Sequence, residues 1–257
     1  MSRLLSIDWD FFAGAREHVF DSPLWGSPDL AFDRLERWRE RARSRGGTGL
    51  EGSGFEGSGF EVLRNDFPLF GNPRELLRFA GVPTFAVVSH DAAYGLLEDL
   101  ECSGVINFDS HHDLFSSSGD PKRLRPGNWA GLALERGLIE SYACIYPAWH
   151  AGVRVGEGFD LERTWSEIGA RAFRDRVCLS SEALGSDHLG LDRLGLDFLG
   201  LNHLGPDSIR AIVLVLSPSW SNPLYDSLFF EIAHGLDAKI QTGLVDRTWS
   251  HHAEPCR

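Results

Sequence analysis

The chain has 257 residues, 42% of them hydrophobic, and a formal net charge of −12. The length suits one large α/β domain or two small ones, and the apolar fraction allows a sizeable core. The acidic charge argues against nonspecific binding to nucleic acid. The sequence shows neither an apolar run near the roughly eighteen residues of a membrane helix nor a signal-peptide pattern, so we expect a cytoplasmic protein that binds neither nucleic acid nor membranes.

Short apolar runs alternate with segments of helical periodicity along the chain. In chain order we expect a strand at 4–8, a helix at 31–42, a strand at 83–89, a helix at 90–100, a strand at 104–109, a helix at 128–137, a strand at 143–146, a helix at 161–173, strands at 176–180 and 211–216, and a helix at 222–233. Strands that are apolar on both faces and alternate with helices are typical of a parallel sheet covered on both sides. The pattern predicts a three-layer α/β/α fold with a mostly parallel sheet, in one domain spanning residues 1–257.

Two segments interrupt this alternation. Residues 46–61 are rich in glycine and contain a tandem Glu-Gly-Ser-Gly-Phe, which predicts a flexible surface loop or an active-site lid. Residues 187–207 repeat Asp-x-Leu-Gly-Leu with a period of five, which fits neither a helix nor a flat strand. We interpret the repeat as an expanded loop, with a short solenoid-like coil as the alternative.

Acidic and imidazole side chains gather in two short motifs, each of which follows an apolar run. Asp8 and Asp10 belong to the stretch Ser-Ile-Asp-Trp-Asp near the N-terminus. Asp109, His111 and Asp113 belong to the stretch Asp-Ser-His-His-Asp. Because alternate side chains of an extended segment point to one face, we expect the members of each motif to converge.

The two motifs and His90 fall at three expected strand ends, where ligands of a doubly wound sheet bind. Carboxylates with imidazole suit Mn²⁺, Zn²⁺ or Fe²⁺, and the oxygen-rich set favours Mn²⁺. Two such ions could activate one water between them, which predicts a metal-dependent hydrolase. The alternatives are that the carboxylates cap helices and that His90 is an ordinary polar residue. His112 is expected on the opposite face, in a structural role.

The motifs resemble those of the ureohydrolase superfamily, which includes arginase and agmatinase. Asp109-Ser-His-His-Asp113 resembles its Asp-Ala-His-x-Asp signature, and Ser6-Ile-Asp-Trp-Asp10 is similar to its Ser-x-Asp-x-Asp signature. The stretch Ser-His-Asp-Ala-Ala-Tyr-Gly loosely resembles its Gly-Gly-Asp-His-Ser element, with His90 in the ligand position. In arginase the Ser-x-Asp-x-Asp element comes late in the chain, so the motif order here is permuted.

The permuted order is similar to that of an arginase-like family that includes peptide arginases, which convert arginine side chains of ribosomally made peptides into ornithine. Residues 127–138, 146–149 and 217–220 resemble this family as well. The resemblance implies an arginase/deacetylase-like fold, two Mn²⁺ per chain and an arginine-containing precursor peptide as partner; a homo-oligomer is compatible with it. The implied reaction is attack of metal-activated water on the guanidinium carbon, which releases urea.

The resemblance also implies a ligand set. One Mn²⁺ would be held by Asp8, His90, Asp109 and Asp113. The other would be held by Asp8, Asp10, Asp109 and His111, so that Asp8 and Asp109 bridge the ions. Asp113 is placed to accept or relay a proton.

Two parts of the arginase pattern are missing. The proton-shuttling histidine expected shortly after a Gly-Asn pair is absent, because Gly127-Asn128 is followed by Trp129 and Ala130. The candidates to replace it are His112, His150, His251 and His252. No motif identifies the carboxylate that recognises guanidinium, and the candidates are Glu61, Asp66 and Glu231, each of which also suits a surface salt bridge.

Trp149 and Trp220 each lie a few residues beyond an expected strand. They could wall a cleft and stack on a guanidinium, or they could pack in the core.

Three functional interpretations follow. The first is a Mn²⁺-dependent peptide arginase. The second is a ureohydrolase or deacetylase that acts on a free small molecule. The third is a metal-binding module without catalysis, which the missing shuttle histidine favours.

Overall fold

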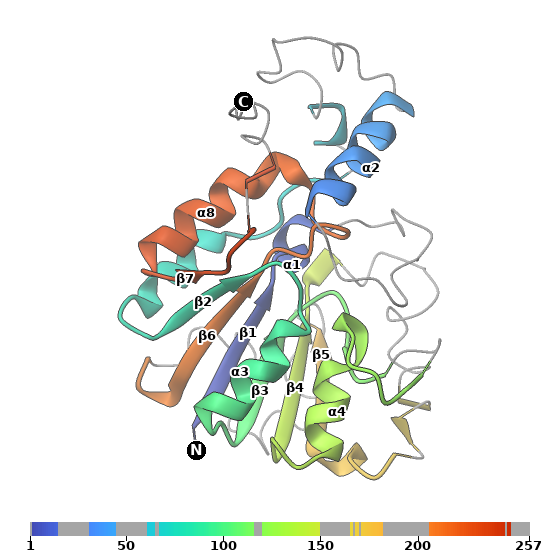
Figure 1. Cartoon of the computed structure of the whole chain (residues 1–257), viewed down its shortest axis with the longest axis vertical. Helices are drawn as coiled ribbons and strands as arrows, with labels where there is room; N and C mark the ends of the chain where they lie inside the picture. The colour runs from blue at the N-terminus through green and yellow to red at the C-terminus, as the bar shows by residue number, and fades with distance from the viewer. Residues whose placement is uncertain are drawn as a thin grey trace.

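The structure is a computed structural model of the whole chain (Figure 1). It describes residues 2–14, 31–44, 61–64, 67–115, 120–149, 165–166, 168–169, 171–181, 206–244 and 246–247, with the side chains of 31–36, 61 and 181 excepted. Most of the two expected insertions therefore lie outside the described residues. Of the expected helix at 161–173, residues 165, 166 and 168 are helical, whereas 169 and 171–173 form turns and a bend, so the expected helix extends too far.

The described strands form one seven-stranded sheet in the order β5-β4-β3-β1-β6-β2-β7. Its members are β1 (Arg3–Asp8), β2 (Thr84–Val87), β3 (Gly104–Phe108), β4 (Ser141–Tyr146), β5 (Val177–Ser181), β6 (Ile209–Val215) and β7 (Lys239–Ile240). Every neighbouring pair is parallel. The predicted mostly parallel sheet is confirmed, and each expected strand overlaps an observed one.

Helices and short 3-10 turns connect these strands. The α-helices are α1 (Asp10–Ala13), α2 (Ala31–Ser44), α3 (Ala92–Leu100), α4 (Trp129–Glu135) and α8 (Asp226–Gly235). The 3-10 helices are η2 (Glu61–Leu63), η3 (Pro73–Phe79), η4 (Pro126–Asn128), η6 (Arg174–Arg176), η8 (Pro206–Ser208) and η9 (Pro223–Tyr225). The short elements α1 and β7 were not predicted, because four or fewer residues carry too little periodicity to be recognised.

Alternate residues of the strands pack into two separate apolar clusters, one on each face of the sheet. In β1, Leu5 and Ile7 pack in the cluster that contains Leu76 of η3 and Phe229 of α8. Leu4 packs in the other cluster, which contains residues of α3 and α4. Figure 1 shows α3 and α4 together along the strands, well apart from α8. The sheet is thus covered on both faces, and the predicted three-layer α/β/α architecture is confirmed.

The position of β1 at the middle of the sheet determines where the acidic motifs meet. β1 pairs with β3 on one side and with β6 on the other. Asp8 is the last residue of β1 and pairs with Val215 at the end of β6. In a parallel sheet the segments that follow neighbouring strands lie at one edge, so the turns after β1, β3 and β6 surround Asp8.

No helix among the described residues is long and apolar enough to cross a membrane.

Candidate metal centre

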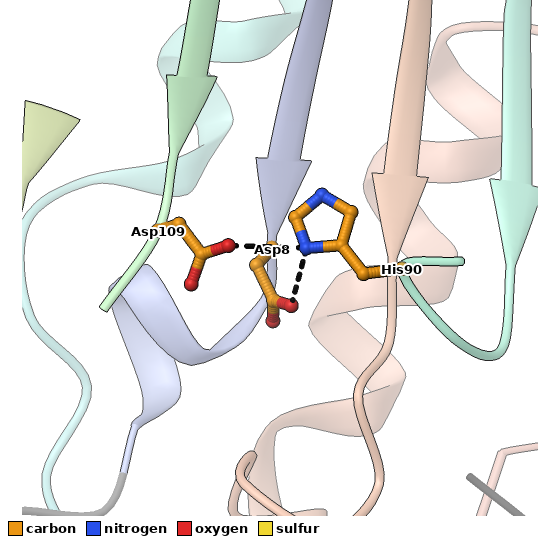
Figure 2. A group of neighbouring side chains, drawn as sticks. All are labelled: Asp8, His90 and Asp109. Atoms are coloured by element: carbon orange, nitrogen blue, oxygen red, sulfur yellow. Dashed lines mark ion pairs between the residues drawn. The ribbon is translucent and has the colours of Figure 1, made fainter. Parts of the chain in front are cut away.

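Four segments bring the predicted ligands together at the carboxyl edge of the sheet. Asp8 ends β1, and Asp10 begins α1. His90 lies in the turn between β2 and α3. Asp109 and the residues to Asp113 follow β3 directly. Figure 2 shows Asp8, Asp109 and His90 pointing toward one another from three separate segments.

The first group of ligands surrounds one nitrogen of His90. The Nδ1 atom lies 3.2 Å from Asp8 Oδ2, 3.0 Å from Asp109 Oδ2 and 2.9 Å from Asp113 Oδ2. All four residues are at least 96% buried. Ligand atoms that bind one ion at about 2.1 Å lie about 3.0 to 3.4 Å apart in octahedral or tetrahedral geometry. The spacing around His90 Nδ1 matches that range.

The second group joins Asp10, Asp109 and His111. His111 Nδ1 lies 3.0 Å from Asp10 Oδ2 and 3.5 Å from Asp109 Oδ1. Asp8, His90 and Asp109 could hold a metal ion, and so could Asp10, Asp109 and His111. Asp109 belongs to both groups, with one oxygen toward each histidine. This is the bridging position that the resemblance implies for Asp109.

The ligands converge by a different route from the one that strand alternation predicted. Asp10 is already helical, and its backbone N–H donates to Asp8 Oδ1 at 3.0 Å. After Asp109 the chain turns instead of continuing as a strand, because the His111 N–H donates to Asp109 Oδ1 at 2.7 Å and Asp113 has a φ of 51°. The expectation of extended backbone from Asp109 to Asp113 was therefore wrong, although the side chains do meet.

Helix α4 fixes the turn that carries Asp113. The N–H groups of Ala130 and Gly131 donate to the Asp113 carbonyl at 3.1 and 3.3 Å. A Cβ at Gly131 would lie 1.8 Å from the Leu114 carbonyl oxygen, so only glycine allows this close approach. The indole Nε1–H of Trp129 donates to Asp113 Oδ2 at 2.7 Å.

Three more hydrogen bonds orient the carboxylates of the centre. The Ser217 hydroxyl donates to Asp8 Oδ2 at 2.5 Å, and Asn107 Nδ2 donates to Asp109 Oδ2 at 2.9 Å. The Ser110 hydroxyl donates to Asp10 Oδ2 at 2.5 Å. Such outer partners set the orientation of metal ligands.

A serine also fixes the ring of His90. The Nε2 atom of His90 lies 2.6 Å from the hydroxyl of Ser6. With Nε2 engaged by Ser6, Nδ1 is left to face the three carboxylates. Sequence reasoning did not assign Ser6, Asn107, Trp129 or Ser217 to the centre. The hydrogen bonds of Ser6, Trp129 and Ser217 depend on chain segments that only the fold brings together, whereas Asn107 is two residues from Asp109 and was missed because it lies within the expected strand.

Burial and mutual charge perturb the ionisation of the centre. Burial, followed by the charges of Asp10 and Asp109, raises the pKa of Asp8 well above its usual value. Burial and the charge of Asp109 raise the pKa of Asp113 to about 6. Burial opposes protonation of His90, but the nearby carboxylates, Asp113 foremost, outweigh it and raise the His90 pKa. For Asp109, burial is outweighed by the neighbouring imidazoles of His111 and His90, which lower its pKa.

This arrangement could hold a compensating cation. Four buried carboxylates lie within a few ångströms of one another, and burial of unpaired charge is strongly unfavourable. His90 Nδ1 is buried and makes no hydrogen bond of good geometry, although three carboxylate oxygens surround it. A divalent cation among these atoms would satisfy the nitrogen and the carboxylates together. The residues present therefore fit a metal ion.

The other predicted catalytic residue within the described chain is His112. Its Nδ1 accepts a hydrogen bond from the Leu114 N–H at 3.0 Å, and its ring packs against Phe115 at 4.5 Å between centroids. Burial and the charge of His111 lower its pKa to about 3. His112 thus supports the turn as a neutral ring. His150, His251 and His252 lie outside the described residues.

The two predicted tryptophans differ in their surroundings. The Trp220 ring lies 4.6 Å from the His111 ring, between centroids, and is partly exposed. Trp149 is 8% exposed, donates through Nε1 to the Phe11 carbonyl at 3.1 Å and stacks on Phe70. Trp220 therefore borders the candidate centre, whereas Trp149 is a packing residue beside α1.

Of the three candidate guanidinium-binding carboxylates, the described residues place the side chain of Glu231 alone, and it pairs with arginine instead of facing the centre. Glu231 lies on α8 and forms an exposed bidentate pair with Arg74, at 2.7 and 2.8 Å. The side chains of Glu61 and Asp66 lie outside the described residues.

The fold and site define a three-layer α/β protein with a buried aspartate–histidine centre that could hold a metal ion. No family model, no curated protein and no solved structure matches this chain.

Proposed function

We propose that this chain is a Mn²⁺-dependent peptide arginase, which hydrolyses the guanidino group of a peptidyl arginine to ornithine and urea during maturation of a ribosomally made peptide. The observation that carries the proposal is the sharing of Asp109 between the His90 group and the His111 group. Two adjacent groups with one common carboxylate support a pair of ions, which suits the activation of one water molecule.

The donor set favours manganese in this proposal. Asp8, Asp10, Asp109 and Asp113 supply carboxylate oxygens, and two histidines supply nitrogen. Oxygen-rich sets with some imidazole suit Mn²⁺, whereas thiolates would favour softer metals. When bound, two such ions would lower the pKa of a water and stabilise negative charge on the reacting group.

The protein's own residues suggest how a guanidinium would approach. The His90 side chain is 2% exposed, whereas the His111 side chain is 22% exposed. The His90 side is covered by Trp129, whose ring lies 5.0 Å from the His90 ring. We therefore assign the His111 side as the entrance, where the partly exposed Trp220 ring can stack on a planar cation.

The reaction needs a proton acceptor beside the entering water. In the proposal, Asp113 accepts a proton from the water and returns it to the departing nitrogen. Water adds to the guanidinium carbon, the bond from that carbon to the side-chain nitrogen breaks, and urea leaves. The side-chain nitrogen then carries the proton as the ornithine amine.

The direct test is to incubate the Mn²⁺-loaded full chain with an arginine-containing precursor peptide and to measure urea and ornithine. The matched control peptide has lysine in place of the arginine, and free arginine and agmatine run in parallel. Conversion of the peptide alone supports a peptide arginase, whereas conversion of free arginine supports a small-molecule ureohydrolase. Absence of conversion in protein shown to hold Mn²⁺ would refute both.

A metal-binding module without catalysis is a second candidate, and one observation favours it. Trp129 and Ala130 follow the Gly-Asn pair where the shuttle histidine was expected; both are fully buried, and Trp129 donates to Asp113. Neither side chain can carry a proton to solvent at neutral pH. Tight Mn²⁺ binding without hydrolysis of any guanidino compound would support this candidate.

A further inference from the structure

The loop after β6 carries two side chains of the candidate centre. Ser217 donates to Asp8 Oδ2, and Trp220 contacts the ring of His111. Ser217 also has a φ of 45°, a left-handed conformation that is unfavourable for a residue with a side chain. Such a conformation persists only where the surroundings hold it in place. The contacts that hold this loop therefore affect the centre.

Arg247 supplies several of those contacts from a distant part of the chain. Its Nη1 donates to the Pro218 carbonyl at 2.8 Å, and its Nη2 donates to the Ser221 carbonyl and hydroxyl, each at 3.1 Å. Asp226 anchors the same guanidinium, at 2.6 Å from Nε and 2.5 Å from Nη2. Both charged residues are at least 99% buried.

The loop has further anchors on the other side. The Pro218 carbonyl also accepts a hydrogen bond from Trp38 Nε1 of α2 at 2.9 Å. The Ser221 hydroxyl donates to the Leu216 carbonyl at 2.5 Å, which closes the loop on itself. Arg247 is the cation of this network, and its planar fork is suited to reach a carboxylate and two carbonyls at once.

We infer that Arg247 is a positioning residue of the metal centre. Its guanidinium holds the loop from Ser217 to Ser221 in the conformation that directs Ser217 to Asp8 and Trp220 to His111. The inference rests on the metal-binding part of the proposed function. It implies that Arg247, which lies far from the candidate ligands in the sequence, sets metal affinity and substrate affinity.

Helix α8 offers a matched control for this inference. It carries two carboxylates in bidentate pairs with arginine, Asp226 with Arg247 and Glu231 with Arg74. The Arg247 pair touches the loop of the centre, whereas the Arg74 pair is exposed. Lysine in either position keeps the positive charge but loses the planar fork.

The experiment compares Arg247→Lys with Arg74→Lys in the full chain. Mn²⁺ binding is followed by calorimetry, coupling between the ions by electron paramagnetic resonance, and folding by circular dichroism. We expect Arg247→Lys to weaken Mn²⁺ binding about 10-fold to 100-fold, which is the range for outer partners of metal ligands. We also expect it to raise the KM for the arginine-containing peptide. Arg74→Lys should bind Mn²⁺ as the unsubstituted protein does.

A chemical rescue separates positioning from general stability. In Arg247→Ala, millimolar guanidinium ion can enter the space left by the side chain, and we expect it to restore part of the Mn²⁺ affinity. Equal Mn²⁺ affinity in Arg247→Lys and Arg74→Lys would overturn the inference, even if Arg247→Ala fails to fold. If the unsubstituted protein itself binds no Mn²⁺, the proposed function fails instead, so the two failures are distinct.

Discussion

The sharing of Asp109 leads to a quantitative prediction about metal-dependent stability. An ion that binds only the folded chain raises its free energy of unfolding, by about 2.7 kcal/mol when the free ion is at about 100 times its Kd. Two such sites give about 5.4 kcal/mol, or a rise of roughly 10 to 20 °C in Tm for a chain of this size. The unsubstituted protein should show a rise of this order with Mn²⁺.

The loss of Mn²⁺-induced stabilisation in a single-residue variant should depend on whether the substituted residue belongs to one group or to both. Asp109 contributes an oxygen to both groups, at 3.0 Å from His90 Nδ1 and 3.5 Å from His111 Nδ1. Asp109→Asn should therefore abolish the rise in Tm. Asp10 contributes only to the His111 group, so Asp10→Asn should leave about half of it, or about 2.7 kcal/mol.

The assay is thermal unfolding by circular dichroism, with and without Mn²⁺, for each variant. Glu231→Gln is the control, because Glu231 is exposed and pairs with Arg74 away from the centre. It should retain the full rise. A full rise in Asp109→Asn, or an equal loss in the Asp10 and Asp109 variants, would refute the assignment of Asp109 as the shared ligand.

Three further substitutions test other parts of the structure. Trp129→Phe removes the indole donor to Asp113 and should weaken Mn²⁺ binding by about 10-fold, measured by calorimetry; unchanged affinity would exclude a supporting role. Trp220→Ala removes the ring beside His111 and should raise KM for a guanidino substrate about 3-fold to 30-fold, with a smaller change in kcat; a change confined to kcat would contradict the stacking role. Asn222→Ala removes a buried helix cap and should lower the free energy of unfolding by about 1 to 3 kcal/mol, measured by urea titration with Arg74→Ala as the exposed comparison.

The fold could be predicted largely because β-type and helical periodicities are local properties of the sequence. The apolar run of β6 was recognised, and the expected helix at 222–233 corresponds to η9 and α8, with the Asn222 side chain accepting from the Leu224 N–H at the start of η9. β7 was missed because it has two residues and is defined only by pairing with β2. Strand order was not predictable, since it depends on contacts between distant segments.

The candidate metal-binding residues of the centre could be predicted from the sequence, but the hydrogen-bond donors that orient them could not. Asp109, His111 and Asp113 lie within five residues, and their side-chain types identify them. Ser217 and Trp129 lie in stretches that resemble the arginase-like family, but nothing in those stretches marks them as donors, and only the fold brings them to the carboxylates. Arg247 could not be recognised for the same reason.

The central place of β1 has a consequence for how the protein folds. Contacts at the centre span 84 residues between Ser6 and His90, 100 between Asp10 and Ser110, and 209 between Asp8 and Ser217. Closing such long loops is entropically unfavourable and slows folding. During synthesis, β1 can pair with β3 on one side early, but its other side is paired only after β6 has been made. We expect the ion-binding pocket to be among the last features to mature, so Asp8 and Asp10 depend on nearly the whole chain being present.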